Sequence, residues 1–239
     1  MEMEFFINPN DGNKWYDYWR EFMLNWAVEQ LGLPKNKFRF RSIPDEEKSH
    51  YAKKQEDFEF QSSSGKWFEL SPMNHRSDWD LSRHQEYSGQ KFTYTDPQTG
   101  EKFIPNVIEI SLGLDRLLYA LLDNALVQEE DRTVLKLSPK VAPYQVAVFP
   151  LLKNKPELVK KAEQIREMLL KAGIRTNWDK RGNIGKRYLA QDEIGTPKCV
   201  TIDFDTLQDE AVTIRDRDTR EQERVEIKQL VEHLQSMIK

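Results

Sequence analysis

The sequence has 239 residues, of which 38% are hydrophobic and 32% are charged, and its formal net charge is −4. This length provides for one large domain or two ordinary ones. The 12 Phe, 8 Tyr and 6 Trp residues are too many for a disordered chain. With a single cysteine and four histidines, we expect no disulfide framework, no metal site and a reducing, cytoplasmic location. No apolar run is long enough for a membrane span, so we expect no membrane partner.

The beginning of the chain predicts a strand followed by a long helix. Residues 1–7 alternate between acidic and apolar side chains, which is typical of a strand with one polar face. The helix is predicted from Asp11 to Leu31, because Gly32 follows as a stop signal. Four aromatic residues share one face of this helix and are expected in the core: Trp15, Trp19, Phe22 and Trp26.

The next stretch predicts antiparallel strands. Residues 38–43 alternate as a strand, and residues 58–70 form two strand-like runs around Ser-Ser-Ser-Gly, a hairpin signal. Residues 91–104 predict a second hairpin around Asp-Pro-Gln-Thr-Gly. One more strand is expected over residues 107–111 and a leucine-rich helix over residues 113–126. The first part of the chain is therefore predicted to be α+β.

A proline-containing linker at residues 137–143 is expected to separate two domains, residues 1–137 and residues 141–239. Strands and helices alternate in the second domain, which predicts an α/β fold with a mostly parallel sheet. The expected elements are strands over 146–151, 174–178, 199–204 and 211–215, and helices over 157–171, 184–193 and 227–238.

The segment from Glu109 to Arg116 combines residue types that suit a binding site. A predicted strand ends in a carboxylate and the Ser111 hydroxyl, the chain turns at Gly113, and an arginine follows in the first helical turn. Because the helix dipole is positive there, Arg116 requires an anion or a carboxylate partner. A polyphosphate or an adenine ring fits this guanidinium. The alternative is a simple surface pair between Asp115 and Arg116.

A second candidate site is a basic loop between a predicted strand and a predicted helix. Lys180, Arg181, Lys186 and Arg187 supply positive charge, and Tyr188 could stack on a base. The loop also contains glycines, which let a phosphate backbone approach closely. These residues predict contact with RNA, and the alternative is an ordinary charged surface loop.

The strand, the Gly-x-Asp-Arg sequence and the leucine-rich helix together resemble motif 3 of class II aminoacyl-tRNA synthetases, and the preceding Glu-x-Ser resembles its glycine-specific form. The resemblance extends over nearly the whole chain. Residues 1–6 are similar to the second strand of motif 2, and the matching segments further on are residues 49–53, 69–70, 76–84, 182–205 and 213–217. The last two of these segments resemble the anticodon-binding domain of that family.

This resemblance implies a glycine–tRNA ligase that activates glycine with ATP, accompanied by Mg²⁺, and transfers glycyl to tRNA. It implies catalytic roles for Arg116 and Glu109. The implied ATP-binding residues are Glu69, Leu70, Gly113, Leu114, Asp115 and Arg116, and the implied glycine-binding residues are Glu2, Arg76, Glu109 and Ser111. The alternative for Glu2 is a solvated strand residue. The implied fold is the antiparallel sheet of a partial class II catalytic domain, followed by an α/β anticodon-binding domain.

The sequence also departs from the family pattern. It begins inside motif 2, so motif 1, which builds the family's dimer interface, and the motif 2 arginine are not represented. Ser71-Pro72 replaces a usual Glu-Gly, which we expect to remove a carboxylate beside the glycine site, and Ile110 replaces a usual proline. We therefore expect a shortened ligase or the downstream part of a split or larger one. The alternative is a non-catalytic paralogue that binds nucleic acid or assists another enzyme.

Overall fold

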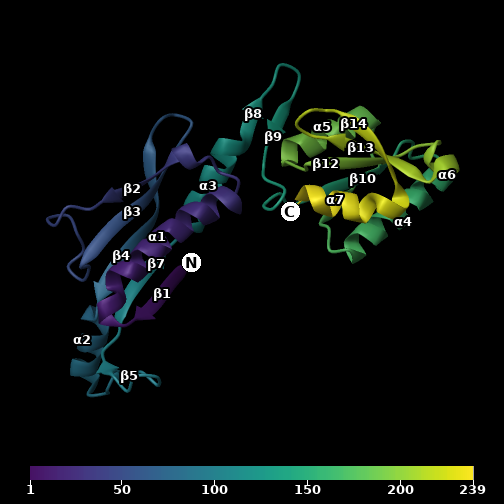
Figure 1. Ribbon diagram of the computed structural model, residues 1–239. Coiled ribbons are helices and arrows are strands. Elements are labelled where there is room, and N and C mark those ends of the chain that lie inside the picture. Colours follow the sequence, from purple (N-terminus) through teal and green to yellow (C-terminus); the bar gives the residue numbers. More distant parts are fainter. Residues whose placement is uncertain (239) are drawn as a thin grey trace. The chain divides into compact units, whose positions relative to one another are not determined.

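The structure, a computed structural model, describes residues 1–238, and its internal contacts divide the chain into two units (Figure 1). The first unit comprises Met1–Glu29 and Leu33–Asn124, and the second comprises Gln30–Gly32 and the chain from Ala125 onward. The contact boundary therefore lies before the proline-containing segment that the sequence suggested as a linker. None of the helices in the described range is long and apolar enough to cross a membrane.

The first unit contains a five-stranded sheet in the order β1-β7-β4-β3-β2, in which every neighbouring pair is antiparallel. The strands are β1 (Glu2–Ile7), β2 (Phe38–Ser42), β3 (Lys54–Gln61), β4 (Trp67–Ser77) and β7 (Asn106–Ser111). The predicted strands at residues 1–7, 38–43 and 107–111 are confirmed, as is the hairpin that joins β3 to β4. The antiparallel α+β class is confirmed with them.

Three helices accompany this sheet: α1 (Gly12–Glu29), α2 (Trp79–Ser88) and α3 (Leu114–Ala125). The predicted second hairpin forms from two short strands, β5 (Tyr94–Thr95) and β6 (Lys102–Phe103), and single 3-10 turns lie at Pro9–Asp11 and Lys35–Lys37. The sequence did not predict α2. Its exposed polar surface lacks a continuous apolar stripe, so helical periodicity gave no signal.

Helix α1 packs on the sheet through a different face from the predicted one. Its buried side chains are Tyr16, Met23 and Ala27, and the Tyr16 hydroxyl donates a hydrogen bond to the Met73 carbonyl at 3.1 Å. The four aromatic residues expected in the core are only partly buried or exposed: Trp15, Trp19, Phe22 and Trp26. Two of their rings instead pack edge-on against Phe5 of β1.

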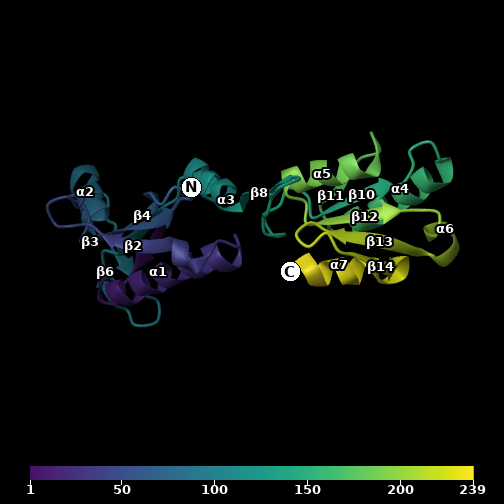
Figure 2. The same cartoon turned by 90° about the horizontal axis from the view of Figure 1, so that it is seen from above.

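The sheet of the second unit has the order β11-β10-β12-β13-β14, which Figure 2 shows from above. Its strands are β10 (Val146–Pro150), β11 (Thr176–Trp178), β12 (Lys198–Ile202), β13 (Ala211–Asp216) and β14 (Gln222–Glu226). Strand β10 pairs in parallel with β11 and β12, whereas β12–β13 and β13–β14 are antiparallel. The prediction of a mostly parallel sheet is wrong, because the β13–β14 hairpin adds two antiparallel pairs.

The helices of the second unit are α4 (Pro156–Lys171), α5 (Ile184–Ile194), α6 (Thr206–Asp209) and α7 (Leu230–Ile238), with a 3-10 turn at Ile227–Gln229. A two-stranded hairpin, β8 (Leu126–Gln128) and β9 (Thr133–Leu135), also belongs to this unit. The predicted helices at residues 157–171 and 184–193 are confirmed. Helix α7 and the preceding 3-10 turn occupy the predicted closing helix.

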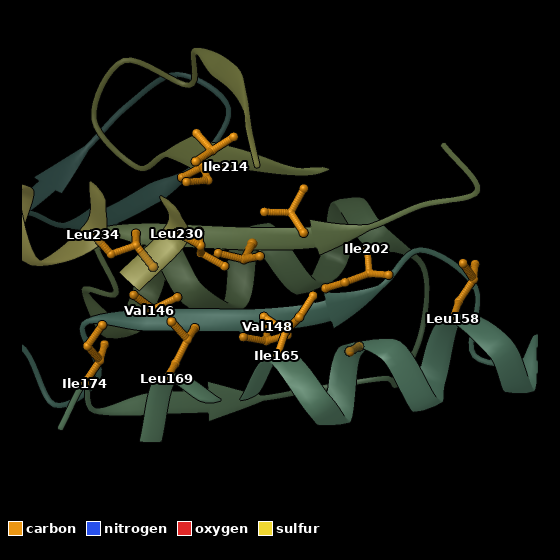
Figure 3. Packing of buried hydrophobic residues seen from close by; sticks show 14 residues of the cluster. Val146, Val148, Leu158, Ile165, Leu169, Ile174, Ile202, Ile214, Leu230 and Leu234 are labelled. Carbon is orange, nitrogen blue, oxygen red and sulfur yellow. The ribbon is translucent and has the colours of Figure 1, made fainter. Parts of the chain in front are cut away.

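The central strand β10 is apolar on both faces, so both faces of the sheet are covered. Val146 and Val148 contribute to a cluster with α4 and α7 (Figure 3), whereas Ala147 and Phe149 pack with Cys199 beneath α5. Helix α4 buries a stripe at helical spacing that consists of Leu158, Ala162, Ile165 and Leu169. A layer of helix lies on each face, and the predicted α/β class of this unit is confirmed.

A pair of neighbouring leucines on α4 tests this packing. Leu169 is 0% exposed, whereas Leu170 is 43% exposed. Leu169→Ala should lower the free energy of unfolding of the second unit by roughly 2–5 kcal/mol, because it leaves a cavity in the cluster. Leu170→Ala should change it by less than about 0.5 kcal/mol. Urea unfolding followed by circular dichroism measures both changes, and equal losses would contradict the assignment of the buried face.

Candidate functional site

One face of the first sheet gathers acidic and polar side chains. The register pairs Glu2 with Ser111 and Glu4 with Glu109 across β1 and β7, and it pairs Asn74 with Glu109 across β4 and β7. Because alternate residues of a strand share a face, these five side chains lie on the same side of the sheet. The carboxylate oxygens of the three glutamates lie within 4.8 Å of one another. This polar face therefore concentrates negative charge at one place.

Glu109 is the buried centre of this group, with 6% of its surface exposed. Its Oε2 atom accepts a hydrogen bond from Arg76 Nη1 at 2.8 Å and another from Asn74 Nδ2 at 2.8 Å. Burial raises the pKa of Glu109, but the hydrogen bonds from Arg76 and Asn74 outweigh it and hold the pKa below the ordinary value. Burial, followed by the charge of Glu109, raises the pKa of Glu4. Glu109 therefore ionises more readily than the neighbouring Glu4.

Arg76 is held from several sides. Asp80 of α2 accepts two hydrogen bonds from it, from Nε at 2.7 Å and from Nη2 at 2.8 Å, and the Tyr51 ring lies 4.0 Å from its guanidinium carbon. This bidentate pairing raises the pKa of Arg76. The remaining nitrogen, Nη1, is the one that reaches Glu109. The predicted residues Arg76, Glu109, Glu2 and Ser111 are therefore brought together, and the ionised Glu109 offers only acceptor oxygens, which suit an ammonium group.

Arg116 lies near the start of α3 and pairs with Glu69 of β4. Its Nη1 atom donates to Glu69 Oε1 at 2.9 Å and to the Glu69 carbonyl at 2.8 Å, so its carboxylate partner is Glu69 rather than Asp115. The Gly113 N–H donates to the Leu70 carbonyl at 3.2 Å. The Arg116 side chain is 55% exposed, and an exposed pair of this kind contributes only about 0–1 kcal/mol. An anionic ligand could therefore replace Glu69.

A β-bulge brings Glu69 to the polar face. Phe58 pairs with Ser71 but Glu59 pairs with Glu69, so Leu70 is an extra residue that resets the alternation of β4. Ser71 is 0% exposed and its hydroxyl donates to the Pro72 carbonyl at 3.2 Å. Ser71 thus lies on the core side with Phe58, and the expected loss of a carboxylate beside the glycine site at this position is wrong. Leu114 and Asp115 are exposed in the first turn of α3.

The loops that follow the parallel strands of the second unit are basic. Lys180 and Arg181 follow β11, and Lys186 lies in the first turn of α5; all three side chains are exposed. The Asn183 side chain caps this helix by accepting a hydrogen bond from the Lys186 N–H at 2.9 Å. Arg181 pairs with Asp179 at 3.1 Å. These three predicted residues are placed where a large partner could reach them.

Sequence reasoning missed three further residues at the same strand ends. Lys153 and Lys155 follow β10, and Phe204 follows β12 and is 41% exposed. Lys155 Nζ lies 6.0 Å from the centre of the Phe204 ring. Because β10, β11 and β12 are parallel, the loops after them leave the same edge of the sheet, where α/β domains commonly bind ligands. The sequence could not group these residues, because the order of the strands in the sheet was not known from it.

Arg187 and Tyr188 have packing roles in place of the predicted RNA contacts. Arg187 is 2% exposed, and its guanidinium donates to the Pro150 carbonyl at 2.6 Å. The Tyr188 hydroxyl shares a hydrogen bond of 2.6 Å with Thr201, and its ring packs against Phe149. Both residues lie on the inner face of α5. Their side chains therefore stabilise the contact between that helix and the sheet.

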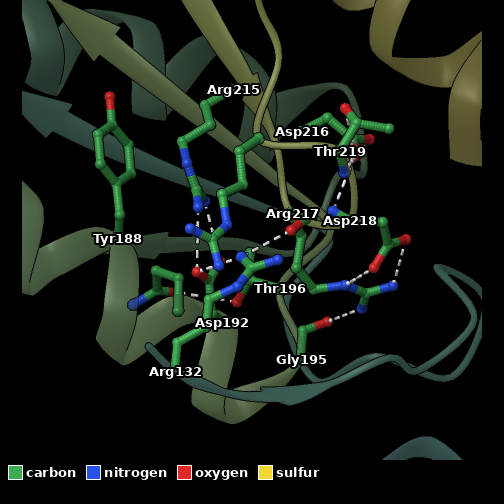
Figure 4. A network of polar contacts seen from close by, with 12 residues as sticks. Arg132, Tyr188, Asp192, Gly195, Thr196, Arg215, Asp216, Arg217, Asp218 and Thr219 are labelled. Atoms are coloured by element: carbon green, nitrogen blue, oxygen red, sulfur yellow. Dashed lines mark hydrogen bonds and ion pairs between the residues drawn. The ribbon is translucent and has the colours of Figure 1, made fainter. Parts of the chain in front are cut away.

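Asp192 of α5 centres a buried network of charges (Figure 4). It is 0% exposed and accepts hydrogen bonds from Arg132 at 2.7 Å and from Arg215 at 2.9 and 3.1 Å. Arg217 binds three backbone carbonyls, those of Leu135, Leu137 and Gly195. Arg132 lies between β8 and β9, so this network fastens the hairpin and the chain after it to α5 and β13.

Comparisons with known proteins agree with this architecture. Residues 145–237, most of the second unit, match the family described as "Anticodon binding domain". An antiparallel sheet followed by such a domain is consistent with part of a class II aminoacyl-tRNA synthetase, and the fold prediction is confirmed at this level.

The individual relatives are more specific. The chain is 47% identical to "Glycine--tRNA ligase" of Caldanaerobacter subterraneus subsp. tengcongensis over 243 residues, which is 100% of this chain and 51% of the relative. It is 44% identical to the proteins of the same name from Alkaliphilus oremlandii and Streptomyces coelicolor, covering 52% and 54% of them. The chain is therefore homologous over its full length to glycine–tRNA ligases, and it spans about half the length of these relatives.

The buried charge of Asp192 yields a prediction about local stability. Asp192→Asn removes the carboxylate that compensates Arg132 and Arg215, and breaking a buried pair in this way costs about 3–5 kcal/mol. Hydrogen exchange measured by mass spectrometry should show faster exchange in α5 and in the β8–β9 hairpin. Asp131→Asn is the matched control, because Asp131 is 62% exposed and pairs with Arg220 at the surface. Equal protection in both variants would contradict the role of the network.

Proposed function

We propose that this chain provides the glycine site and one nucleotide-binding arginine of a glycine–tRNA ligase. The observation that supports this most directly is the ionised Glu109 held by Arg76 beside Glu2 and Ser111. Glycine has no side chain, so its recognition depends on its ammonium and carboxylate groups. An acceptor-lined polar face suits the ammonium group.

The proposed reaction joins glycine to AMP before transfer to tRNA. A glycine carboxylate oxygen attacks the α-phosphorus of ATP, and pyrophosphate leaves with the electrons of the broken P–O bond. Arg116, near Leu70 and Gly113, is the cation proposed to leave Glu69 and bind the nucleotide. Mg²⁺ accompanies ATP as the counter-charge of its phosphates. Glu69 then offers a carboxylate oxygen, the ligand type that Mg²⁺ prefers.

The second unit is proposed to bind the tRNA. Its match to an anticodon-binding domain supports this, and the exposed Lys180, Arg181 and Lys186 supply the phosphate contacts. Phe204 adds an exposed ring on which a base can stack. Aminoacylation of tRNA serves protein synthesis, so we place the protein in the cytoplasm.

Glycine-dependent ATP–pyrophosphate exchange tests the catalytic proposal. The chain should support exchange, alone or with a polypeptide that corresponds to the other half of its relatives. Glu109→Gln and Arg116→Gln should each lower the rate by about 10²-fold or more, because each removes a charge proposed to face glycine or ATP. Glu163→Gln, an exposed position on α4, is the control. Nucleic-acid binding without any exchange would instead establish a non-catalytic paralogue.

Salt dependence of RNA binding tests the proposed tRNA surface. Lys180→Ala combined with Lys186→Ala should weaken binding of a tRNA(Gly) transcript and lower the slope of log K against log salt by about one per lysine. The matched control removes two lysines outside these loops, Lys171 and Lys228, which are 74% and 75% exposed. Filter binding at several salt concentrations measures the slope. An equal effect of both double variants would show that only net charge matters.

A further inference from the structure

Arg76 and Asn74 both donate to the same oxygen of the Glu109 carboxylate. Both donors in its hydrogen bonds, Arg76 and Asn74, come from the same strand and reach the same atom, Oε2. Because β4 has an alternating side-chain direction, residues two positions apart present these donors side by side. Oε2 therefore receives both of these hydrogen bonds and Oε1 receives neither, while the carboxylates of Glu2 and Glu4 lie within 4.8 Å.

We propose that Asn74 is a positioning residue for Glu109: its amide fixes the carboxylate so that Oε1 faces the ammonium group of the amino acid. This inference rests on the proposed function, because it assigns the orientation of the same site. Asn74 is 2% exposed, so water does not compete for its donor. Asp80 holds Arg76 from the other side, which makes both donors rigid.

The neutral charge of Asn74 matters as much as its hydrogen bond. Glu109 is faced by Glu2 and Glu4 from β1, by Arg76 from β4, and through Arg76 by Asp80 from α2. A second cation in place of Asn74 would cancel more of the negative charge that attracts an ammonium group. An amide orients Glu109 and leaves that charge in place. It thereby combines a fixed geometry with an undiminished negative potential.

The other half of the Asn74 amide supports the same role. Its Oδ1 atom is buried and has no hydrogen-bond partner among the described residues. An unsatisfied buried acceptor is unfavourable, so an apolar side chain would fill this position of the sheet at lower cost. The amide is therefore not explained by packing alone. Its donor to Glu109 is the interaction that accounts for it.

Carbon-13 NMR of protein labelled at glutamate Cδ measures this orientation without requiring catalysis. The Glu109 signal is assigned by its disappearance in Glu109→Gln. In Asn74→Leu, the pKa of Glu109 should rise by about one pH unit, the shift that corresponds to one lost hydrogen bond to a charged group. Asn74→Ser is the second variant if the leucine variant does not fold, and it should show a smaller rise, because its hydroxyl can restore part of the bond.

Addition of glycine gives a second readout. The wild-type Glu109 signal should shift with glycine but not with N,N,N-trimethylglycine, which lacks an N–H donor, and Asn74→Leu should weaken glycine binding about tenfold. Asn106→Leu is the matched control, because Asn106 is a buried amide of β7 that contacts His75 instead of Glu109. An unchanged Glu109 pKa in both Asn74 variants would overturn the proposal. Absence of a glycine response in the wild type would overturn the proposed function instead, and the pKa comparison would still decide the role of Asn74.

Discussion

The candidate site of the first unit depends on the compensation of the buried carboxylate of Glu109. A carboxylate in the middle of a sheet is unfavourable unless its charge is paired and its oxygens accept hydrogen bonds. Arg76 and Asn74 meet both requirements, and they do so only if β4 and β7 pair in the observed register. A slip by one residue would move Glu109 to the core side of the sheet. The interaction that defines the candidate site therefore also specifies the alignment of the strands that build it.

The second unit meets the same constraint with a different result. The charge of Asp192 is compensated by Arg132 and Arg215, and Asp192 is 0% exposed. Its oxygens are used up within the protein, so the network joins segments and offers nothing to a ligand. Glu109, in contrast, keeps one oxygen outside its hydrogen bonds to Arg76 and Asn74. The two acids therefore differ in how the arginine and amide donors are distributed over their oxygens: both oxygens of Asp192 receive them, but only Oε2 of Glu109 does.

Sequence patterns predicted the elements with one clear periodicity. The side chains of strands β1 and β7 alternate regularly, and helix α4 has an apolar stripe, so the sequence predicted these two strands and this helix. Helix α2, the β8–β9 hairpin and β14 were not, because these segments are short or mostly exposed and have no regular apolar pattern. The β14 residues are mostly exposed, and only Val225 gives an inward signal. Local periodicity does not show which strands pair with each other. It therefore could not predict that the second sheet combines parallel and antiparallel pairs.

Sequence patterns were also limited in predicting which residues form the candidate sites. Glu109 and Arg76 lie 33 positions apart but were grouped correctly, because the resemblance carried information about their positions in space. Asn74 was not found, since a single amide in a strand has no distinctive pattern. In the basic loop, the sequence instead assigned an RNA contact to a residue that the structure buries. Arg187 looked equivalent to Lys180 and Lys186 in sequence, yet its guanidinium is buried against backbone carbonyls.

The contrast between arginine and lysine in the second unit has a physical reason. A planar guanidinium has several donors at fixed angles and is weakly hydrated, so it can satisfy carbonyls and carboxylates inside the protein. Arg132, Arg187, Arg215 and Arg217 are all buried in this way. A lysine ammonium is strongly hydrated and remains outside, as it does at residues 153, 155, 180 and 186. The exposed positive charge at the strand ends therefore comes mainly from lysines, and a count of all basic residues overstates it.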